Sequence, residues 1–166
     1  MTDRNVLSGD NRAKREEIVG LLEQAYWMEI ETVMSYVSNS VNPDGVRAAE
    51  IKKSLQVDIA EELGHAQQFA NRIKELYGTV PGSEQFASVQ GFLQPPADPT
   101  DLTSVIRGVI EAEQGAVDHY SRIIEVCADV DPVTEDMVIT ILADEQGHMR
   151  EFEGFLKEYE AEGQAS

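Results

Sequence analysis

The sequence Ala60-Glu61-Glu62-Leu63-Gly64-His65 returns in large part 83 residues later, as Ala143-Asp144-Glu145-Gln146-Gly147-His148. A phenylalanine follows the histidine by four residues in both copies, at Phe69 and at Phe152. The shared pattern is therefore Ala-acid-Glu-x-Gly-His-x-x-x-Phe. An internal repeat of this kind predicts that the chain is built from two equivalent halves.

Within each copy, a glutamate precedes the histidine by three residues, which gives the pairs Glu62 with His65 and Glu145 with His148. Residues three apart lie on the same face of an α-helix, because an α-helix has about 3.6 residues per turn. Such a pair can bind one metal ion. Two pairs on separate helices form half of the ligand set with which a four-helix bundle holds two metal ions, and one glutamate from each remaining helix completes it.

A glycine directly precedes each of these histidines, at Gly64 and Gly147. Glycine in the interior of a helix costs about 1 kcal/mol relative to alanine. The matched positions suggest a steric need beside the histidines. The alternative is that both glycines were inherited from an ancestral duplication, since single glycines are tolerated in helices.

Apolar residues at spacings of three and four predict four long helices, at residues 10–42, 46–77, 101–129 and 131–159. Pro43-Asp44-Gly45 predicts a tight turn after the first helix, and Gly78 is placed to end the second. Asp131 and Pro132 suit the cap and the first position of the fourth helix. Short turns make the first two and the last two helices antiparallel neighbours.

Residues 79–100 hold four of the six prolines in the chain and are expected to be extended rather than helical. About 22 residues can span about 70 Å, more than the roughly 50 Å length of a helix of about 32 residues. This segment can therefore carry the chain back along the whole bundle. We expect an all-α fold, an antiparallel four-helix bundle at residues 10–160 with a long crossover between the second and third helices, and flexible tails at 1–9 and 161–166.

The first and third predicted helices each carry two acidic residues near the middle, Glu29 or Glu31 in the first and Glu111 or Glu113 in the third. Residues two apart point to opposite sides of a helix, so one of each pair faces inward. The repeat selects Glu29 and Glu113, because each is followed seven residues later by a tyrosine. The predicted metal-binding and catalytic residues are therefore Glu29, Glu62, His65, Glu113, Glu145 and His148.

The chemistry of this residue set indicates which metals it suits. Carboxylates can bridge two cations, and imidazole completes a site that suits iron or manganese. The lack of a thiolate disfavours a structural zinc site. We expect two metal ions, most readily iron, with manganese as the alternative. Metal-bound imidazoles donate their second ring N–H to an acceptor, and Glu61 and Asp144, with Asp58 as a weaker candidate, are predicted for that role.

Composition and charge exclude several classes of function. At 166 residues with a single cysteine, Cys127, the chain is expected to form one domain without an intrachain disulfide. The net charge of −18 argues against nucleic acid or an anionic membrane as partner, because phosphate binding needs clustered Lys and Arg. Residues 1–10 lack the apolar core of a signal peptide, and no uncharged run reaches transmembrane length. We therefore expect a soluble cytoplasmic protein.

Over residues 12–160 the sequence resembles the ferritin-like superfamily of diiron carboxylate proteins, in particular bacterioferritin and rubrerythrin. Residues 29–36 and 144–148 are especially similar to bacterioferritin. The resemblance implies oxidation of Fe(II) by O2 or H2O2 at a paired site. The ligand roles that it implies are bridging by Glu62 and Glu145, terminal ligation by Glu29 and Glu113, and one imidazole per metal from His65 and His148.

Three departures limit what this resemblance implies. Leu63 stands where bacterioferritin has the methionine that binds haem, so no haem is expected. Only 18 residues follow His148, which is too few to add the short fifth helix of cage-forming ferritins, so a 24-subunit shell is not implied. The single Cys127 cannot supply the rubredoxin-like iron module of rubrerythrin, and any electrons must come from an external donor.

Three hypotheses of function follow from the sequence. The leading one is a diiron oxidase whose substrates are Fe(II) and O2 or H2O2. The missing fifth helix favours a second, a rubrerythrin-like peroxidase fed by an external electron donor. A third, from another class, is a non-catalytic helical module whose acidic surface binds a partner. For each of them, the long apolar and aromatic surface of the bundle predicts a homo-oligomer, at least a dimer.

The remaining conspicuous residues receive structural interpretations. Tyr36 and Tyr120 are expected in the core, with partners for their hydroxyls. Trp27 is expected to serve in packing or at a subunit interface. Cys127 is expected to be buried, and His119, which belongs to no repeat, to be solvated.

Overall fold

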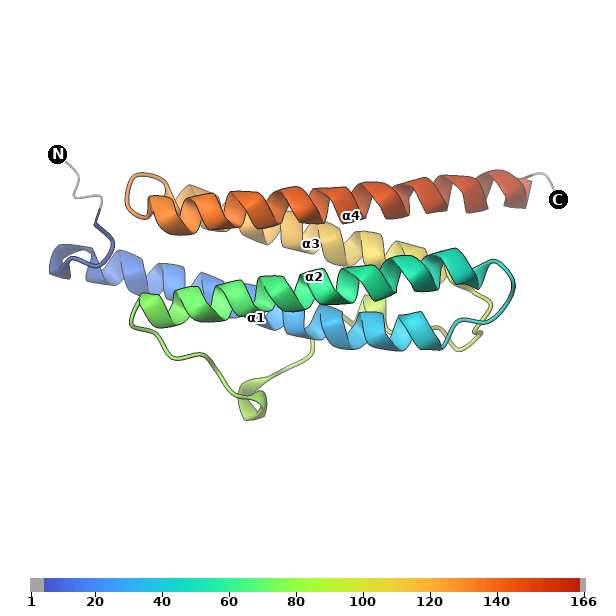
Figure 1. Ribbon diagram of the computed structural model, residues 1–166, viewed down its shortest axis with the longest axis horizontal. Helices are drawn as coiled ribbons and strands as arrows, with labels where there is room; N and C mark the ends of the chain where they lie inside the picture. Colours follow the sequence, from blue (N-terminus) through green and yellow to red (C-terminus); the bar gives the residue numbers. More distant parts are fainter. Residues whose placement is uncertain (1–4, 165–166) are drawn as a thin grey trace.

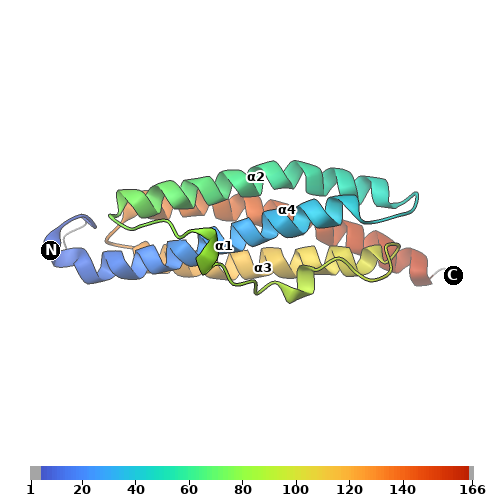
Figure 2. The ribbon, with the colours of Figure 1, turned by 90° about the horizontal axis from the view of Figure 1, so that it is seen from below.

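The structure, a computed structural model, describes residues 5–164. It contains four long helices, which are α1 (Arg12–Val41), α2 (Ala48–Glu75), α3 (Leu102–Cys127) and α4 (Pro132–Gln164). The described residues contain no strand. Figures 1 and 2 show the helices side by side along one axis, as an elongated bundle. The predicted all-α four-helix bundle is confirmed.

The bundle consists of two helical hairpins, since α1 packs mainly against α2 and α3 mainly against α4. Asp131 caps α4 by accepting a hydrogen bond from the Thr134 backbone N–H at 3.1 Å, as its position before Pro132 predicts. The α4 helix continues to Gln164, so it extends past its predicted end at residue 159 into the stretch that was expected to be a tail. Among the described residues, no helix is long and apolar enough to cross a membrane.

The end of α2 corrects the role predicted for Gly78. The residue with the left-handed backbone is Tyr77, with φ of 66°. The backbone N–H of Tyr77 bonds to the Lys74 carbonyl at 3.1 Å and that of Gly78 to the Ile73 carbonyl at 2.9 Å, which is a Schellman motif. Gly78 is needed for space, because a Cβ there would lie 2.9 Å from side-chain atoms of Ile73 and Val19.

Residues 5–9 are more ordered than the tail expected at residues 1–9, of which residues 1–4 lie outside the described residues. Val6 is 5 % exposed and belongs to the apolar core, and a short 3-10 helix, η1 (Gly9–Asn11), precedes α1. The Arg15 guanidinium donates to the backbone carbonyls of Val6 at 2.8 Å and Ser8 at 3.1 Å. Residues 5–9 are therefore part of the bundle, held by contacts that hydropathy patterns do not reveal.

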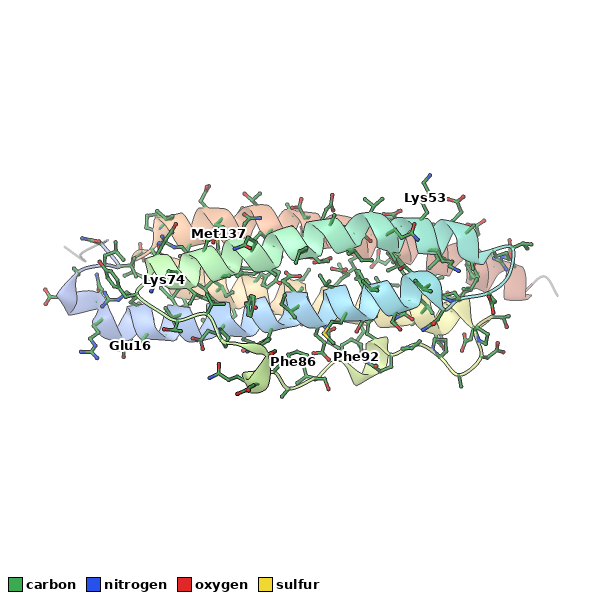
Figure 3. All side chains as sticks on the ribbon, turned by 60° about the horizontal axis from the view of Figure 1, so that its bottom comes forward. Glu16, Lys53, Lys74, Phe86, Phe92 and Met137 are labelled. Carbon is green, nitrogen blue, oxygen red and sulfur yellow. The ribbon has the colours of Figure 1, made fainter. Side chains whose placement is uncertain are left out.

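The predicted crossover connects α2 to α3 and runs along the outside of α1 and α3 (Figure 2). It contains two short 3-10 helices, η2 (Ser83–Gln85) and η3 (Gly91–Leu93), and carries Phe86 and Phe92 (Figure 3). The Asn39 side chain donates to the Leu93 carbonyl at 2.8 Å, which ties the crossover to α1. Gly108 lets it approach α3, since a Cβ there would lie 2.8 Å from the Phe92 carbonyl oxygen.

The apolar core is divided into two clusters along the bundle. One contains Leu22, Phe69 and Ile123, and the other contains Leu55 and Phe152. Between them along every helix lies a buried acidic residue, at positions 29, 62, 113 and 145. The fold thus places a polar layer in the middle of its own core, and burial of charge there requires compensation.

We predict opposite effects for two alanine substitutions on α3. Gly108→Ala forces the crossover backbone away from the helix and is expected to lower the free energy of unfolding by about 1–3 kcal/mol. Gly115→Ala meets no atom within 4 Å and is expected to raise it by up to about 1 kcal/mol, through helix propensity alone. Denaturant titration of both variants measures this, and equal stability of Gly108→Ala and the unaltered protein would contradict the close approach.

Candidate metal centre

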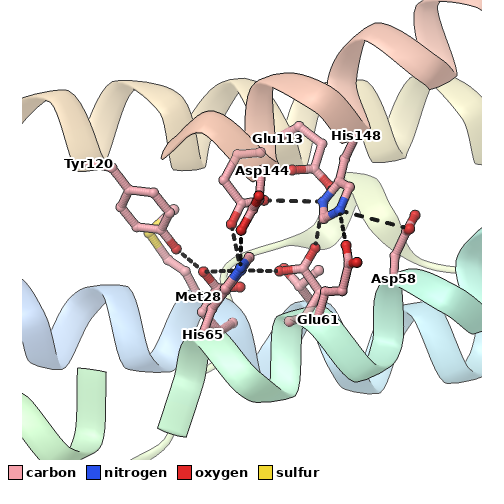
Figure 4. A network of polar contacts seen from close by, with 12 residues as sticks. Met28, Asp58, Glu61, His65, Glu113, Tyr120, Asp144 and His148 are labelled. Carbon is pink, nitrogen blue, oxygen red and sulfur yellow. Dashed lines mark hydrogen bonds and ion pairs between the residues drawn. The ribbon is translucent and has the colours of Figure 1, made fainter. Parts of the chain in front are cut away.

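The structure brings the six predicted site residues together in the middle of the bundle (Figure 4). All six are buried, with His148 the most exposed at 7 %. They form two groups in which ligand atoms lie within 4.8 Å of one another, and Glu62 and Glu145 belong to both groups. The first group also contains Glu29 and His65, and the second Glu113 and His148. Two carboxylates are thus shared between the groups, and each group adds one glutamate and one histidine of its own. A pair of adjacent cations needs this arrangement.

Several potential ligand atoms are buried without a hydrogen-bond partner. They are both carboxylate oxygens of Glu62, Oε1 of Glu145, and Nδ1 of His65 and His148. His65 Nδ1 lies 2.9 Å from Glu145 Oε1, yet the two atoms do not form a hydrogen bond of acceptable geometry. An unsatisfied buried polar atom costs about 1–3 kcal/mol. The atoms therefore face a common point rather than each other, and this donor set fits two divalent cations.

The other nitrogen of each imidazole bonds across the bundle. His65 Nε2, on α2, lies 3.2 Å from an Asp144 carboxylate oxygen on α4, and His148 Nε2, on α4, lies 2.7 Å from Glu61 on α2. Donation from Nε2 leaves the Nδ1 lone pair free for a metal. The structure thus shows both acceptors that were predicted from their place before a ligand glutamate. Asp58 lies farther away, 3.9 Å from His148 Nε2.

The two tyrosines predicted to lie in the core also bond across the bundle. The Tyr36 hydroxyl on α1 donates to Glu113 on α3, and the Tyr120 hydroxyl on α3 donates to Glu29 on α1. Both rings are fully buried. Each hydroxyl fixes the carboxylate oxygen that lies 3.9 Å from the Nδ1 atom of His65 or His148.

The charges within the site are coupled. Burial lowers the pKa of His65, but the carboxylates of Glu145 and Glu62 outweigh it and raise the pKa to about 10. The same two carboxylates raise the pKa of His148 to about 12 against the effect of burial. In return, the imidazoles lower the pKa of Glu62 and Glu145, although burial acts in the opposite direction. At neutral pH these four side chains form two ion pairs.

The remaining carboxyl groups behave differently. Burial, followed by repulsion from Glu62 and Glu145, raises the pKa of Glu29 and Glu113 well above the ordinary value. The direction of this shift favours the protonated form of both carboxyl groups when no cation is bound. A divalent cation therefore has to displace protons from the site to bind.

Several residues differ from their predicted environment. Glu31 does not enter the site, yet it is only 4 % exposed because the crossover covers it. Glu111, the alternative on α3, is exposed to solvent. His119 was expected to be solvated; it is half-buried and its Nε2 lies 2.8 Å from the Leu21 carbonyl oxygen. Cys127 is fully buried, as predicted. Trp27 packs between Tyr26 and Phe86, with ring centroids at 5.1 and 5.2 Å.

The sequence suggested that the two mid-helix glycines avoid a steric clash beside the histidines, and this prediction is wrong for contacts within the chain. A Cβ at Gly64 or Gly147 would meet no atom within 4 Å. Besides Met28 and Thr32 on the inward face of α1, the residues bordering the site include Ala112, Ala116 and Gln90, which the sequence pattern did not single out. Gln90 comes from the crossover, where no periodicity marks a buried position.

We predict that divalent cations release protons on binding. With protons on both imidazoles, and with the pKa of Glu29 and Glu113 raised, cations displace protons at pH 7, and their apparent affinity falls as the pH is lowered. Calorimetric titration of Mn(II) in buffers of different ionisation enthalpy counts these protons. A Glu111→Gln variant, altered on the exposed face of α3, serves as control. Binding without proton release would contradict the assigned protonation.

Comparison with known proteins agrees with this geometry. The family model for the ferritin-like domain matches residues 19–161. The bacterioferritin of Desulfovibrio desulfuricans is 24 % identical over 148 residues, which cover 89 % of this chain and 78 % of that protein. The DNA protection during starvation protein of Pyrococcus furiosus is 28 % identical over 144 residues, which cover 85 % and 77 %.

Solved structures show the same fold. The crystal structure of the D. desulfuricans bacterioferritin, with its diiron site, superimposes with a TM-score of 0.78 at 22 % identity, over 93 % of this chain and 86 % of that one. A dodecameric thioferritin from Bacteroides fragilis gives a TM-score of 0.81 at 23 % identity, over 91 % and 90 %. Because the family model spans most of the chain, including all six buried site residues, the protein is a member of the ferritin-like family.

Proposed function

We propose that this protein oxidises Fe(II) with O2 or H2O2 at a dinuclear site. The observation that carries the proposal is the convergence of buried, unpartnered carboxylate oxygens and imidazole nitrogens from facing helices. Membership of the ferritin-like family supports iron handling. The proposed ligands and catalytic residues are Glu29, Glu62, His65, Glu113, Glu145 and His148.

The shared carboxylates set the geometry of the proposed site. Glu62 and Glu145 belong to both groups of ligand atoms, so they are the residues that would bridge two ions. Glu29 and Glu113 would each bind one ion, held in place by their tyrosine partners. Four carboxylates neutralise two divalent cations. The site suits iron or manganese, because its donors are oxygens and imidazole nitrogens without a thiolate.

The reaction needs two electrons and a supply of protons. Two Fe(II) ions as substrate give two electrons, which with two protons reduce O2 to H2O2, or H2O2 to two molecules of water. Proton release on cation binding places protons next to the reacting atoms. The buried imidazoles stay oriented throughout by Asp144 and Glu61, which are on the surface and can exchange protons with solvent.

The protein has few other groups suited to redox chemistry. Cys127 is buried, and burial raises the pKa of its thiol to about 12, which disfavours a reactive thiolate. Leu63 offers no haem ligand, so we propose a haem-free protein. Repeated turnover would require an external electron donor to reduce Fe(III), as in a rubrerythrin-like peroxidase. We propose that this chemistry takes place in the cytoplasm, as expected from the sequence.

We further propose that the protein self-associates through the outer face of α1 and α2. Met34, Val37 and Val41 follow one line on α1 and are 58, 47 and 66 % exposed. On α2, Leu63 is 53 % exposed and borders a hollow of about 540 Å³ together with Ile30. A second copy of the chain is the occupant that suits this apolar face, and a dodecameric relative shows that the fold permits assembly.

The central test is Fe(II) oxidation by the metal-free protein. Fe(II) added without oxygen should bind to about two ions per chain, and oxygen or peroxide should then oxidise it with saturable kinetics. Glu62→Ala, which removes a shared ligand, is expected to lower the rate at least about tenfold. Glu111→Ala is the matched surface control. An unchanged rate in Glu62→Ala would refute the proposed site. A faster reaction with peroxide would assign peroxidase-type use, and a faster one with oxygen ferroxidase-type use.

For self-association, Leu63→Glu is expected to lower the sedimentation mass of the protein, because it places a charge within the apolar face. Val89→Glu, at an exposed position of the crossover, is the control and should leave the mass unchanged. A monomeric unaltered protein at micromolar concentration would contradict this interface.

A further inference from the structure

Two cavities meet at one wall on the α1–α3 side of the bundle. The outer cavity, of about 650 Å³, lies beneath the crossover and is bordered by Trp27, Phe92 and His119. The inner cavity, of about 10 Å³, is bordered by the candidate ligand carboxylates and Tyr120. The residues that border both cavities are Met28, Gln90 and Ala112. The shortest path from solvent on this side to the site therefore crosses that wall.

Gln90 is the polar part of the wall. Its side chain is 4 % exposed, and Nε2 donates to Thr32 Oγ1 at 2.9 Å and lies 3.5 Å from the Met28 carbonyl oxygen. A carbonyl oxygen only accepts hydrogen bonds, which fixes the amide nitrogen on that side. The other amide atom, Oε1, is buried and has no hydrogen-bond partner. Gln90 thus carries an unused acceptor at the edge of the inner cavity.

The crossover is clamped so that Gln90 stays in this position. Both carboxylate oxygens of Glu31 accept the Val89 backbone N–H, at 2.9 and 3.0 Å, and one also accepts that of Gln90 at 2.8 Å. Gly108 and Asn39 hold the next residues of the crossover. These contacts explain why Glu31 is buried outside the candidate metal centre. Its carboxylate is used to hold the backbone of the wall.

The size and polarity of the two cavities indicate which kind of small molecule they can hold. A cavity of about 10 Å³ is at the lower limit for one water-sized molecule. An unpaired acceptor needs an O–H or N–H donor, which H2O2 and water have and O2 lacks. The outer cavity is bordered by aromatic and small apolar side chains and also by polar ones, which are Glu23, Gln24, Glu31, Gln85 and His119. The Glu31 carboxylate among them is already bonded to the crossover backbone.

We propose that hydrogen peroxide reaches the dinuclear site through the cavity beneath the crossover and is held there by a hydrogen bond to Gln90 Oε1. The inference rests on the proposed function. It adds the side from which the oxidant approaches and a residue, Gln90, that distinguishes H2O2 from O2. Gln90 binds the oxidant and is no metal ligand. Its replacement leaves metal binding intact.

The first experiment replaces Gln90 with leucine, which keeps the wall closed but removes the acceptor. Gln90→Leu is expected to slow oxidation by H2O2 about three- to tenfold and to leave oxidation by O2 unchanged. Mn(II) binding should stay at the stoichiometry of the unaltered protein. Gln85→Leu, at an exposed position bordering only the outer cavity, is the control and should match the unaltered protein.

A second measurement does not depend on turnover. A crystal structure of the metal-free protein is expected to show one ordered water bonded to Gln90 Oε1, and this water should be absent from Gln90→Leu. Gly115→Phe, which extends into the open space of the outer cavity, is expected to slow oxidation by H2O2 without changing Mn(II) stoichiometry.

The outcomes separate this inference from the function on which it rests. Loss of metal binding or oxidation in the unaltered protein would refute the proposed function. Normal oxidation by the unaltered protein, with the same ratio of peroxide to oxygen rates in Gln90→Leu, would overturn the role of Gln90. An unaffected peroxide rate in Gly115→Phe would overturn the route.

Discussion

The structure depends on keeping four carboxyl groups and two imidazoles inside an apolar bundle. Isolated buried charges are too costly to keep, and these groups lie within ion-pair distance of one another or are hydrogen-bonded to a tyrosine. The polar layer divides the core into two apolar clusters, and it lies at the same level in every helix. A shift of one helix along its neighbour by a single turn would separate the pairs. The need to neutralise this layer therefore fixes the register of the bundle.

The pairs that neutralise the layer run between the two hairpins. The Tyr36 hydroxyl on α1 donates a hydrogen bond to Glu113 on α3, and the Tyr120 hydroxyl on α3 donates one to Glu29 on α1. On the opposite side, the imidazoles of α2 and α4 each bond to an acid of the other helix. Each hairpin therefore depends on the other for these hydrogen bonds. The two hairpins of the repeat are therefore held together by hydrogen bonds between them as well as by apolar packing.

Sequence periodicity sufficed to predict the helices and to predict that the six proposed site residues lie together, because helix geometry and the repeat act over short distances. It failed where a side chain meets a distant segment. Glu31 is polar and lies on the outward face of α1, and its burial depends on a crossover without periodic pattern. His119 and Val6 were misjudged for the same reason. Burial of Gln90 is a tertiary property that no local pattern encodes.

The two long sides of the site differ in character, and this difference bears on what can approach it. Exposed carboxylates of Glu61 and Asp144 lie between solvent and the imidazoles on the α2–α4 side, in a chain of net charge −18. That side attracts cations. The α1–α3 side presents Trp27 and Phe92 around a cavity that ends at an amide. The amide of Gln90 offers a hydrogen-bond acceptor there, in contrast to the exposed carboxylates of the opposite side. The crossover, long enough merely to connect two helices, thereby becomes one wall of the candidate metal centre.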